Sequence, residues 1–237
     1  MSLKSGSCSP LSVRSHSWFG SALIVLAALL LVPPAQGQGV FLKKKQTAVF
    51  AQFGYADKDG VSDVAGLFGC AFASIVDVGV GVGRLKQADK GITYIAEQAS
   101  VYVLHQWNRN APYTDPSSSL PVSLSIDQGY AAVFGEGTSG ESQSYLGGTV
   151  YGHVFFNRRT GLVPSVSLLR YLQTNEEGAS KTAIGLSLSF FSADPDNVFT
   201  ITLSHLSAGD EATLGIGFGI NFIQSKKKIA EKSDWDN

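Results

Sequence analysis

The sequence predicts an all-β chain that closes into an antiparallel up-and-down transmembrane β-barrel of about ten strands, with about eight as the alternative count. Segments of roughly nine to thirteen residues alternate apolar side chains with small or polar ones, and this period of two is typical of β-strands. The non-apolar positions are mostly Gly, Ser, Thr and Ala, which suits a narrow barrel interior. Such lengths also match the ~9–11 residues that a tilted strand needs to cross a bilayer.

The segment Ala212–Phe222 shows this alternation most clearly. Its two faces are Leu214, Ile216, Phe218, Ile220 and Phe222 against Gly215, Gly217, Gly219 and Asn221. In a soluble sandwich the apolar face would meet a second sheet, and the other face would carry charged residues toward water. Charge here is concentrated in the loops and tails, so lipid is the favoured neighbour of the apolar face. A soluble secreted barrel or sandwich remains the second interpretation.

Residues 1–37 have the features of a secretory signal peptide. Lys4 and Arg14 precede the apolar run Trp18–Val32, which two prolines end. The small residues Ala35 and Gly37 then occupy the −3 and −1 positions of a cleavage after Gly37. An uncleaved membrane anchor is disfavoured because the run is short for a spanning helix, which needs about 20 residues.

The composition limits the classes of partner. Removing residues 1–37 takes away two of the 18 basic residues and no acid, so the expected mature net charge is 16 − 19 = −3. A nucleic-acid partner is not expected, because such proteins usually carry a strongly basic face. Cys8 lies in the signal segment, which leaves Cys70 alone and predicts no internal disulfide.

The mature chain divides into three parts. Residues 38–46 contain three consecutive lysines and are expected to form a short, solvated basic leader. Residues 47–223 form the barrel. Residues 224–237 are expected to be a charged periplasmic tail.

The first five predicted strands lie between residues 47 and 134. Their ranges are Thr47–Ala56, Val64–Ala73, Val76–Leu85, Ile92–Leu104 and Leu120–Phe134. In the third, four valines alternate with Asp77 and three glycines, the same division as in the last segment. The fourth has a blurred period, for which a β-bulge is the expected cause. The sequence Asp-Lys-Asp-Gly at 57–60 predicts the first turn.

The other five strands follow to residue 222. Their ranges are Tyr145–Phe156, Leu162–Leu172, Lys181–Phe191, Val198–Leu206 and Ala212–Phe222. Asp194-Pro195-Asp196-Asn197 is strong turn chemistry. The odd-numbered connections read as longer polar loops, and three of the four even-numbered ones as tight turns. Because bacterial barrels pair long outer loops with short periplasmic turns, this places both termini in the periplasm.

The signal peptide, the ten alternating segments and the closing run Gly217–Phe222 together resemble bacterial outer-membrane β-barrel proteins. The run has the general form of the barrel-assembly signal of such proteins, with Gly217, Ile220 and Phe222 at its defining positions. The resemblance covers residues 47–222 and implies outer-membrane lipid and the barrel-assembly machinery as partners. In many such proteins the terminal Phe ends the chain, whereas here fifteen residues follow it.

One small group of residues suggests catalysis. His205 and Ser207 continue the lipid-facing side of the ninth strand, and Glu211 follows closely. A His-x-Ser pair on such a strand resembles the arrangement in outer-membrane lipid A deacylases, in which the Ser attacks an ester and an acid orients the His. The match is short, so no catalytic residue is assigned and the enzyme stays an alternative. The histidines have no metal-ligand spacing, and neither a metal nor a cofactor is expected.

A second set of polar residues is expected to face the lumen. Its members are Asp77, Asp127, Thr149, Tyr151 and His153, with Glu97 as an uncertain addition. Ten strands enclose little space once side chains are placed, so a narrow pore or a closed barrel is expected. The leading function is therefore a non-enzymatic envelope barrel, either a small pore or a structural or binding protein. The alternatives are the ester hydrolase and a soluble secreted barrel that binds a small apolar ligand.

Overall fold

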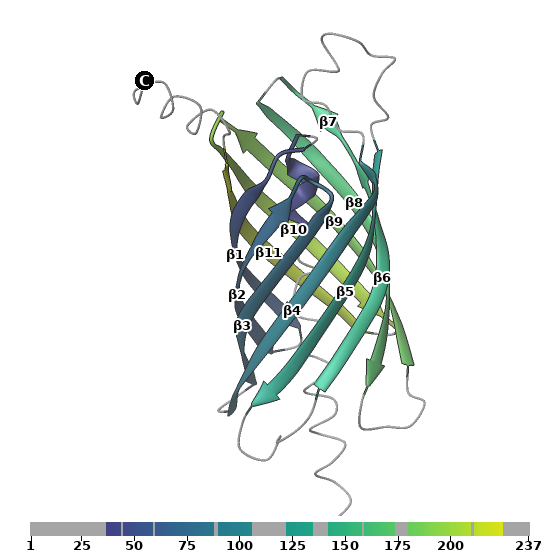
Figure 1. Cartoon of the computed structure of the whole chain (residues 1–237). Helices are drawn as coiled ribbons and strands as arrows, with labels where there is room; N and C mark the ends of the chain where they lie inside the picture. Colours follow the sequence, from purple (N-terminus) through teal and green to yellow (C-terminus); the bar gives the residue numbers. More distant parts are fainter. Residues whose placement is uncertain are drawn as a thin grey trace, which may run out of the picture.

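The computed structural model describes residues 37–43, 45–58, 60–87, 90–105, 122–134, 142–157, 159–173, 180–209 and 211–224. These residues form one antiparallel sheet closed on itself (Figure 1). In chain order its strands are β1 (Ala48–Lys58), β2 (Val61–Phe72), β3 (Val76–Gln87), β4 (Lys90–His105), β5 (Val122–Phe134), β6 (Ser142–Gly152), β7 (Val154–Phe155), β8 (Thr160–Gln173), β9 (Ser180–Ala193), β10 (Asn197–Ala208) and β11 (Glu211–Ile223). The 3-10 helix η1 (Gln38–Phe41) precedes them, and within the described ranges no helix is long and apolar enough to cross a membrane. Residues 1–36 of the expected signal peptide 1–37, and residues 225–237 of the expected tail 224–237, lie outside the described residues.

The barrel closes by pairing its first and last strands. β1 and β11 pair antiparallel over ten positions, from Ala48 opposite Ile223 to Asp57 opposite Leu214. β6 and β7 are two parts of one strand interrupted at His153, since both pair with β8. The described chain therefore forms a closed ten-stranded antiparallel barrel, which confirms the predicted fold class. Closure leaves no unpaired strand edge, and a sheet in hydrocarbon requires this.

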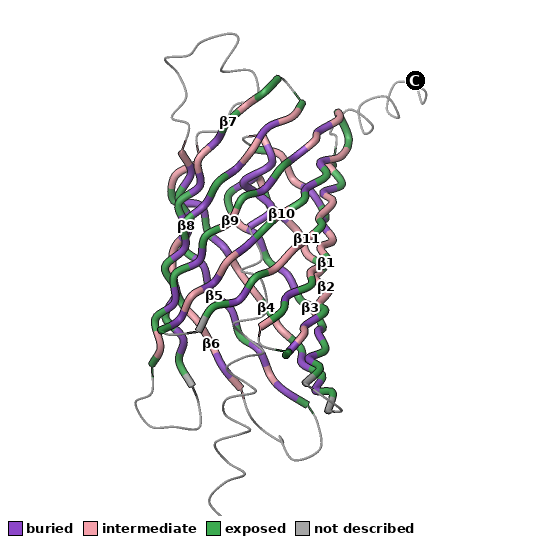
Figure 2. The backbone as a smooth tube through the Cα atoms, turned by 180° about the vertical axis from the view of Figure 1, so that it is seen from behind, coloured by how far each residue is buried: buried purple, intermediate pink, exposed green. Residues whose placement is uncertain are grey.

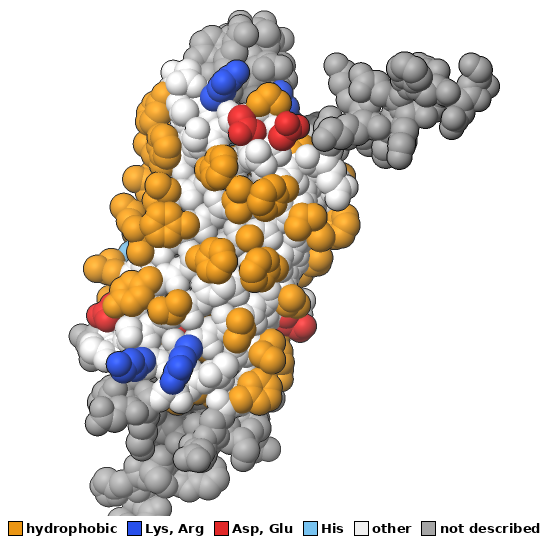
Figure 3. All heavy atoms as spheres, turned by 90° about the vertical axis from the view of Figure 1, so that its left-hand side faces the viewer, with side chains coloured by type: hydrophobic (Ala, Val, Ile, Leu, Met, Phe, Trp, Pro, Cys, Tyr) orange, Lys and Arg blue, Asp and Glu red, His pale blue; other side chains and the backbone are white. Residues whose placement is uncertain are grey.

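The two faces of the sheet differ as the alternation predicts. Exposed and buried residues alternate along the strands (Figure 2). The face shown in Figure 3 carries apolar side chains over its middle, and acidic and basic side chains toward its two ends. The outward apolar set includes Phe53, Val80, Ile126, Leu168, Leu203 and Phe218. This outer surface suits contact with lipid chains.

The strands extend further than the sequence indicates. Only two residues separate β1 from β2 (59–60), β3 from β4 (88–89) and β10 from β11 (209–210). We call the end where β1 begins and β11 ends the terminal mouth, and the opposite end the far mouth. The first, third and ninth connections are thus two-residue turns where longer polar loops were expected, so the predicted division by loop length is wrong for them. The longest connection, 106–121, is the even-numbered exception that the sequence already indicated, and it leaves from the terminal mouth. Polar residues at the strand ends pair in the sheet although their sequence is typical of loops.

Two local predictions are confirmed. A shift of register between Tyr102 and Leu104 marks the bulge expected in the fourth strand. In the turn between β9 and β10, the backbone N–H groups of Asn197 and Asp196 donate to Asp194 Oδ1 at 2.6 and 2.9 Å. The bond from Asn197 contributes most, and together the two bonds hold the pKa of the Asp194 carboxyl below its ordinary value.

Candidate functional site: the filled barrel interior

The terminal mouth holds a segment of the chain itself. Residues 37–42, which we call the plug, lie inside this end of the barrel, where η1 is visible (Figure 1). Gln38, Val40, Phe41 and Leu42 are each at most 1% exposed. The expectation that 38–46 is a solvated leader is therefore wrong for 38–42. The triplet 40–42 is apolar, and the gain from burying it outweighs the tendency of the lysines after it to stay in water.

Hydrogen bonds join the plug to three strands of the barrel. The backbone N–H of Gly39 donates to Oδ2 of Asp77 on β3 at 2.7 Å. Asn221 on β11 donates through Nδ2 to Oε1 of Gln38 at 2.8 Å. The ring of His105 on β4 lies 3.3 Å, measured from Nε2, from the carbonyl oxygen of Leu42. Buried backbone groups of the plug thus have specific partners, as burial demands.

Gly39 sits where the plug approaches the wall most closely. A Cβ at this position would come within 2.7 Å of Asp77 Oδ1 and 2.8 Å of the Tyr102 ring. Tyr102 also donates its hydroxyl to Asp77 Oδ2 at 3.0 Å, so both side chains are held in place. Only glycine fits between them without displacing one of these groups.

Apolar contacts complete the seat of the plug. Val40 and Phe41 pack in a cluster with Tyr102, Tyr151 and Phe191, and the rings of Phe41 and Phe191 lie 6.2 Å apart. Leu42 packs in a second cluster with these residues of β1 and β2: Ala48, Phe50 and Ala71. The plug is consequently part of the interior core and fills the terminal mouth.

A polar network lies across the interior beside the plug. Asp127 accepts from the hydroxyls of Ser125 at 2.8 Å and Thr149 at 2.6 Å, and the Thr149 and Ser167 hydroxyls lie 2.9 Å apart. The Ser125 hydroxyl is also 3.4 Å from that of Tyr151. These groups satisfy one another in a region that excludes water.

Two histidines extend this network toward the mouth. The hydroxyl of Ser123 lies 3.0 Å from Nε2 of His153 and 3.4 Å from Nδ1 of His105. The structure therefore places the five residues expected to face the lumen inside the barrel, all buried: Asp77, Asp127, Thr149, Tyr151 and His153. All lie in the half of the interior nearest the terminal mouth. They join hydrogen-bonded groups and do not line an open passage.

The interior toward the far mouth is filled mainly by apolar and aromatic side chains. Tyr94, Tyr145 and Tyr171 pack together there with aliphatic residues, and the Tyr145 and Tyr171 rings are 5.7 Å apart. Tyr94 donates to Oδ2 of the buried Asp63 at 2.7 Å. A cavity of about 50 Å³ remains between the tyrosines, lined also by Gln98. It has room for one or two water molecules and for nothing larger.

The sequence did not predict that the plug fills the terminal mouth or that tyrosines fill the interior toward the far mouth. The alternation identified which residues face inward, but it does not indicate how far tyrosines on different strands reach across the interior. The Asp63–Tyr94 pair went unnoticed because Asp63 lies between the predicted turn at 57–60 and the predicted strand Val64–Ala73. Its position directly before that strand, on the parity that faces inward, is the signal that could have identified it.

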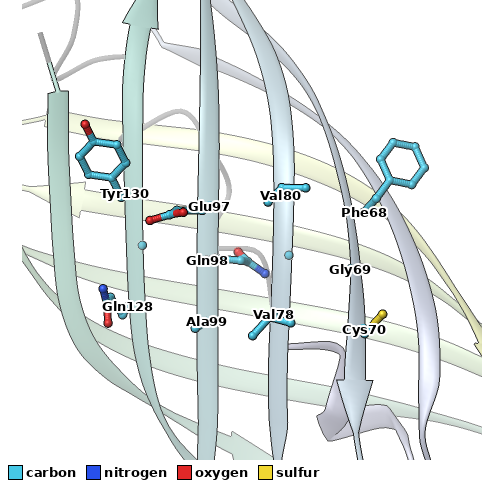
Figure 4. A pocket seen from close by; sticks show the side chains of 12 residues that line it. Phe68, Gly69, Cys70, Val78, Val80, Glu97, Gln98, Ala99, Gln128 and Tyr130 are labelled. Atoms are coloured by element: carbon cyan, nitrogen blue, oxygen red, sulfur yellow. The ribbon is translucent and has the colours of Figure 1, made fainter. Parts of the chain in front are cut away.

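Glu97 differs from its expected placement. It faces outward, on the wall formed by β2 to β5, where it lines a shallow groove of about 470 Å³ with Gln128 and Tyr130 (Figure 4). Rings of Phe50 and Tyr145 cover the inner side of the glycines that form the groove's floor. Even positions of β4 face inward up to Tyr102, so Glu97 cannot reach the lumen.

The suggested catalytic residues lie away from the interior network. His205 and Ser207 share the outward-facing parity of β10 with Phe199, Ile201 and Leu203 and are half-buried. Glu211 opens β11 opposite Ala208, and its side chain lies outside the described part of the structure. Gly217, Ile220 and Phe222, the expected assembly signal, lie on β11 where it pairs with β1. Among the described residues no group of three or more His, Cys, Asp or Glu side chains is arranged to hold a metal ion.

The described chain is a closed antiparallel sheet whose outer surface carries a band of apolar side chains. The chain has the fold of an outer-membrane β-barrel. Several solved structures of such barrels resemble it. They include the translocator domain of the autotransporter NalP from Neisseria meningitidis (9% identity, 86% of this chain and 97% of that one, TM-score 0.46). The β domain of the Bordetella autotransporter BrkA is another (7% identity, 75% and 99%, TM-score 0.43).

The N-terminal β-barrel domain of OprF from Pseudomonas aeruginosa is a third (9% identity, 75% and 97%, TM-score 0.34). No protein-family profile and no curated protein matches the chain. At these identities and TM-scores the resemblance says nothing of what this barrel does. Its architecture follows from its own strand pairing, and its function has to be argued from its interior.

Proposed function

We propose that this chain is a closed, non-enzymatic barrel of the bacterial outer membrane. It is anchored in lipid by its apolar band, and its role is structural or binding. One observation carries the proposal: the plug fills the terminal mouth while the tyrosines fill the opposite half of the interior. The cavity of about 50 Å³ between the tyrosines is too small for a solute pathway. The barrel accordingly has no constitutive channel.

Reaching the outer membrane requires export and assembly. We infer that residues 1–37 are removed as a signal peptide by cleavage after Gly37 and that the barrel-assembly machinery inserts the rest. The terminal segment Gly217–Phe222 supports this, because it lies on the strand that closes the barrel.

The proposal makes a direct prediction for the wild-type protein. It should fractionate with the outer membrane, show a heat-dependent shift on gels, and remain silent when inserted into planar bilayers. Insertion is checked independently, by resistance of the barrel to protease in the same vesicles. A protein that stays soluble after export would overturn the membrane location, and steady single-channel currents from the inserted barrel would overturn the closed interior.

The hydrolase alternative has its own test. Ser207→Ala removes the only suggested nucleophile, and a triad without its nucleophile loses activity by about 10⁶-fold. We expect the lipid A acylation pattern to be identical in cells that carry the wild type and cells that carry the variant, as read by mass spectrometry. His205→Ala serves as the companion variant. A shared loss of deacylated lipid A in both variants would establish the enzyme and remove the non-enzymatic proposal.

A further inference from the structure

Asp77 is a buried carboxyl group with unused bonding capacity. It is 1% exposed and lies on β3 next to the plug. Its Oδ2 accepts from the N–H of Gly39 and the hydroxyl of Tyr102, but its buried Oδ1 has no hydrogen-bond partner. A buried polar atom without a partner is uncommon in a well-packed interior and calls for an explanation.

No basic side chain compensates this carboxyl group. Among the described residues the buried acidic and basic side chains are Asp63, Asp77, Asp127 and His153, and none is Lys or Arg. A buried carboxylate without a cation is strongly unfavourable, and a single well-placed positive group would relieve this.

The chain itself has a source of such a group at this place. A Cβ on Gly37 would come within 3.0 Å of Asp77 Oδ2, and the backbone N–H of Gln38 lies against the same carboxyl group. Hydrolysis of the bond between Gly37 and Gln38 consumes one water. It leaves a carboxylate on Gly37, which departs with the signal peptide, and an ammonium group on Gln38.

We propose that Asp77 forms a buried ammonium-binding site that the new N-terminus of the mature chain occupies. The inference rests on the cleavage that we proposed above. An amide nitrogen has one donor, whereas an ammonium group has three, so the mature Gln38 nitrogen can serve Oδ1 as well as Oδ2. Cleavage thus converts the plug from a segment held at Asp77 by hydrogen bonds alone into one held there by a buried ion pair as well.

The side chain of Gln38 fits this role. An N-terminal Gln can cyclise by attack of its α-amine on its own carboxamide, with loss of ammonia, and this would destroy the ammonium group. Here Oε1 accepts from Nδ2 of the buried Asn221 at 2.8 Å, which holds the carboxamide toward β11. The amine is directed to β3 and the carboxamide to β11, so the folded barrel should protect the terminus from cyclisation.

The first measurement is the intact mass of the chain purified from outer membranes. We expect a chain that begins at Gln38 with an uncyclised amine. A chain lighter by one ammonia, or one that begins elsewhere, would overturn the ion pair. Neither result would contradict the proposal of a closed barrel, because the conductance and fractionation tests do not depend on the terminal residue.

The second measurement is the reactivity of the α-amine toward an acylating reagent near neutral pH. In the folded wild type we expect acylation at least about tenfold slower than in the denatured chain. Asp77→Asn keeps an acceptor for Gly39 and Tyr102 but removes the charge, and it should raise the rate toward the denatured value. Asp63→Asn is the matched control, because Asp63 is an equally buried carboxyl bonded to a tyrosine at the far side.

The control separates the ion pair from simple burial. Asp63→Asn should leave the α-amine as protected as in the wild type. Equal protection in the wild type and in Asp77→Asn would show that burial alone shields the terminus, and the proposal would fail. Full reactivity in the folded wild type would also overturn it.

Discussion

Replacing Gly39 by valine should expel the plug from the barrel. The new side chain would meet Asp77 and the Tyr102 ring, and it would separate the Gly39 N–H from its acceptor. Fully burying an apolar side chain of the size of Val40, Phe41 or Leu42 contributes about 1.5–3 kcal/mol to the free energy of folding. When the plug leaves its buried position, all three contributions are lost together. The plug is not one of the paired strands, so we expect the strand pairing of the barrel to remain.

Limited proteolysis measures the release. In the wild type the backbone around Lys43 is tied by its N–H to Gln46 Oε1, and that of Lys45 to Ala73 and Ser74. A lysine-directed protease should therefore cut the wild type slowly and the Gly39→Val variant fast at 43–45, with the barrel intact in both. Gly66→Val is the control, because a Cβ there meets nothing closer than 3.4 Å, at the Phe53 ring, and lies away from the plug. Equal cutting of all three proteins would show that the plug is not held as described.

The Gly39→Val variant also tests the proposal that the interior of the barrel is closed. Expelling the plug opens the terminal mouth, but the tyrosines of the opposite half remain in place. We therefore expect Gly39→Val to stay silent in planar bilayers. Conduction by this single variant would show that the plug alone seals the barrel.

An arginine at the middle of the outer band should strongly destabilise the barrel in lipid. Phe218 lies near the centre of β11, is half-exposed and pairs with Phe53 and Ile201 on the neighbouring strands. A basic residue on the lipid face costs about 2–4 kcal/mol at the bilayer midplane and about 0–1 kcal/mol near the interfaces. Phe218→Arg should lower the free energy of unfolding accordingly.

The depth of the position provides the control. Leu172→Arg changes an equally outward residue next to the end of β8, where we expect a loss within about 1 kcal/mol. Denaturant unfolding from lipid vesicles gives both values. If the two variants lose the same stability, the outer band does not lie in hydrocarbon, and the soluble-barrel alternative gains support.

The sequence is sufficient to predict the strands that form the wall of this barrel, but not how the side chains and the plug pack inside it. Alternation along Ala212–Phe222 and along residues 122–134 assigns both faces, because a period of two leaves each side chain only two directions. Strand ends were misjudged where polar pairs such as Asp57 and Ser62 continue the ladder towards a two-residue turn. Turn chemistry is local, whereas the length of a ladder depends on the partner strand.

The interior could be predicted residue by residue but not as an assembly. Asp127 and Thr149 lie 22 positions apart, and their contact arises from the register of β5 with β6 and from the reach of their side chains. The plug was missed for a different reason. The lysine run after Leu42 dominates the local composition, and three apolar residues are too few to show a period.

The position of the plug also constrains the order in which the molecule can be assembled. The seam between β1 and β11 joins positions such as Ala48 and Ile223, nearly the full length of the barrel sequence apart, so it is among the last contacts that a growing sheet can make. The plug is joined to β1 by residues 43–47, a tether of about 17 Å when fully extended. Such a short tether keeps the plug at the lip of the sheet while the seam is open. The plug can therefore enter the ring while the seam is still open and become enclosed as the seam closes.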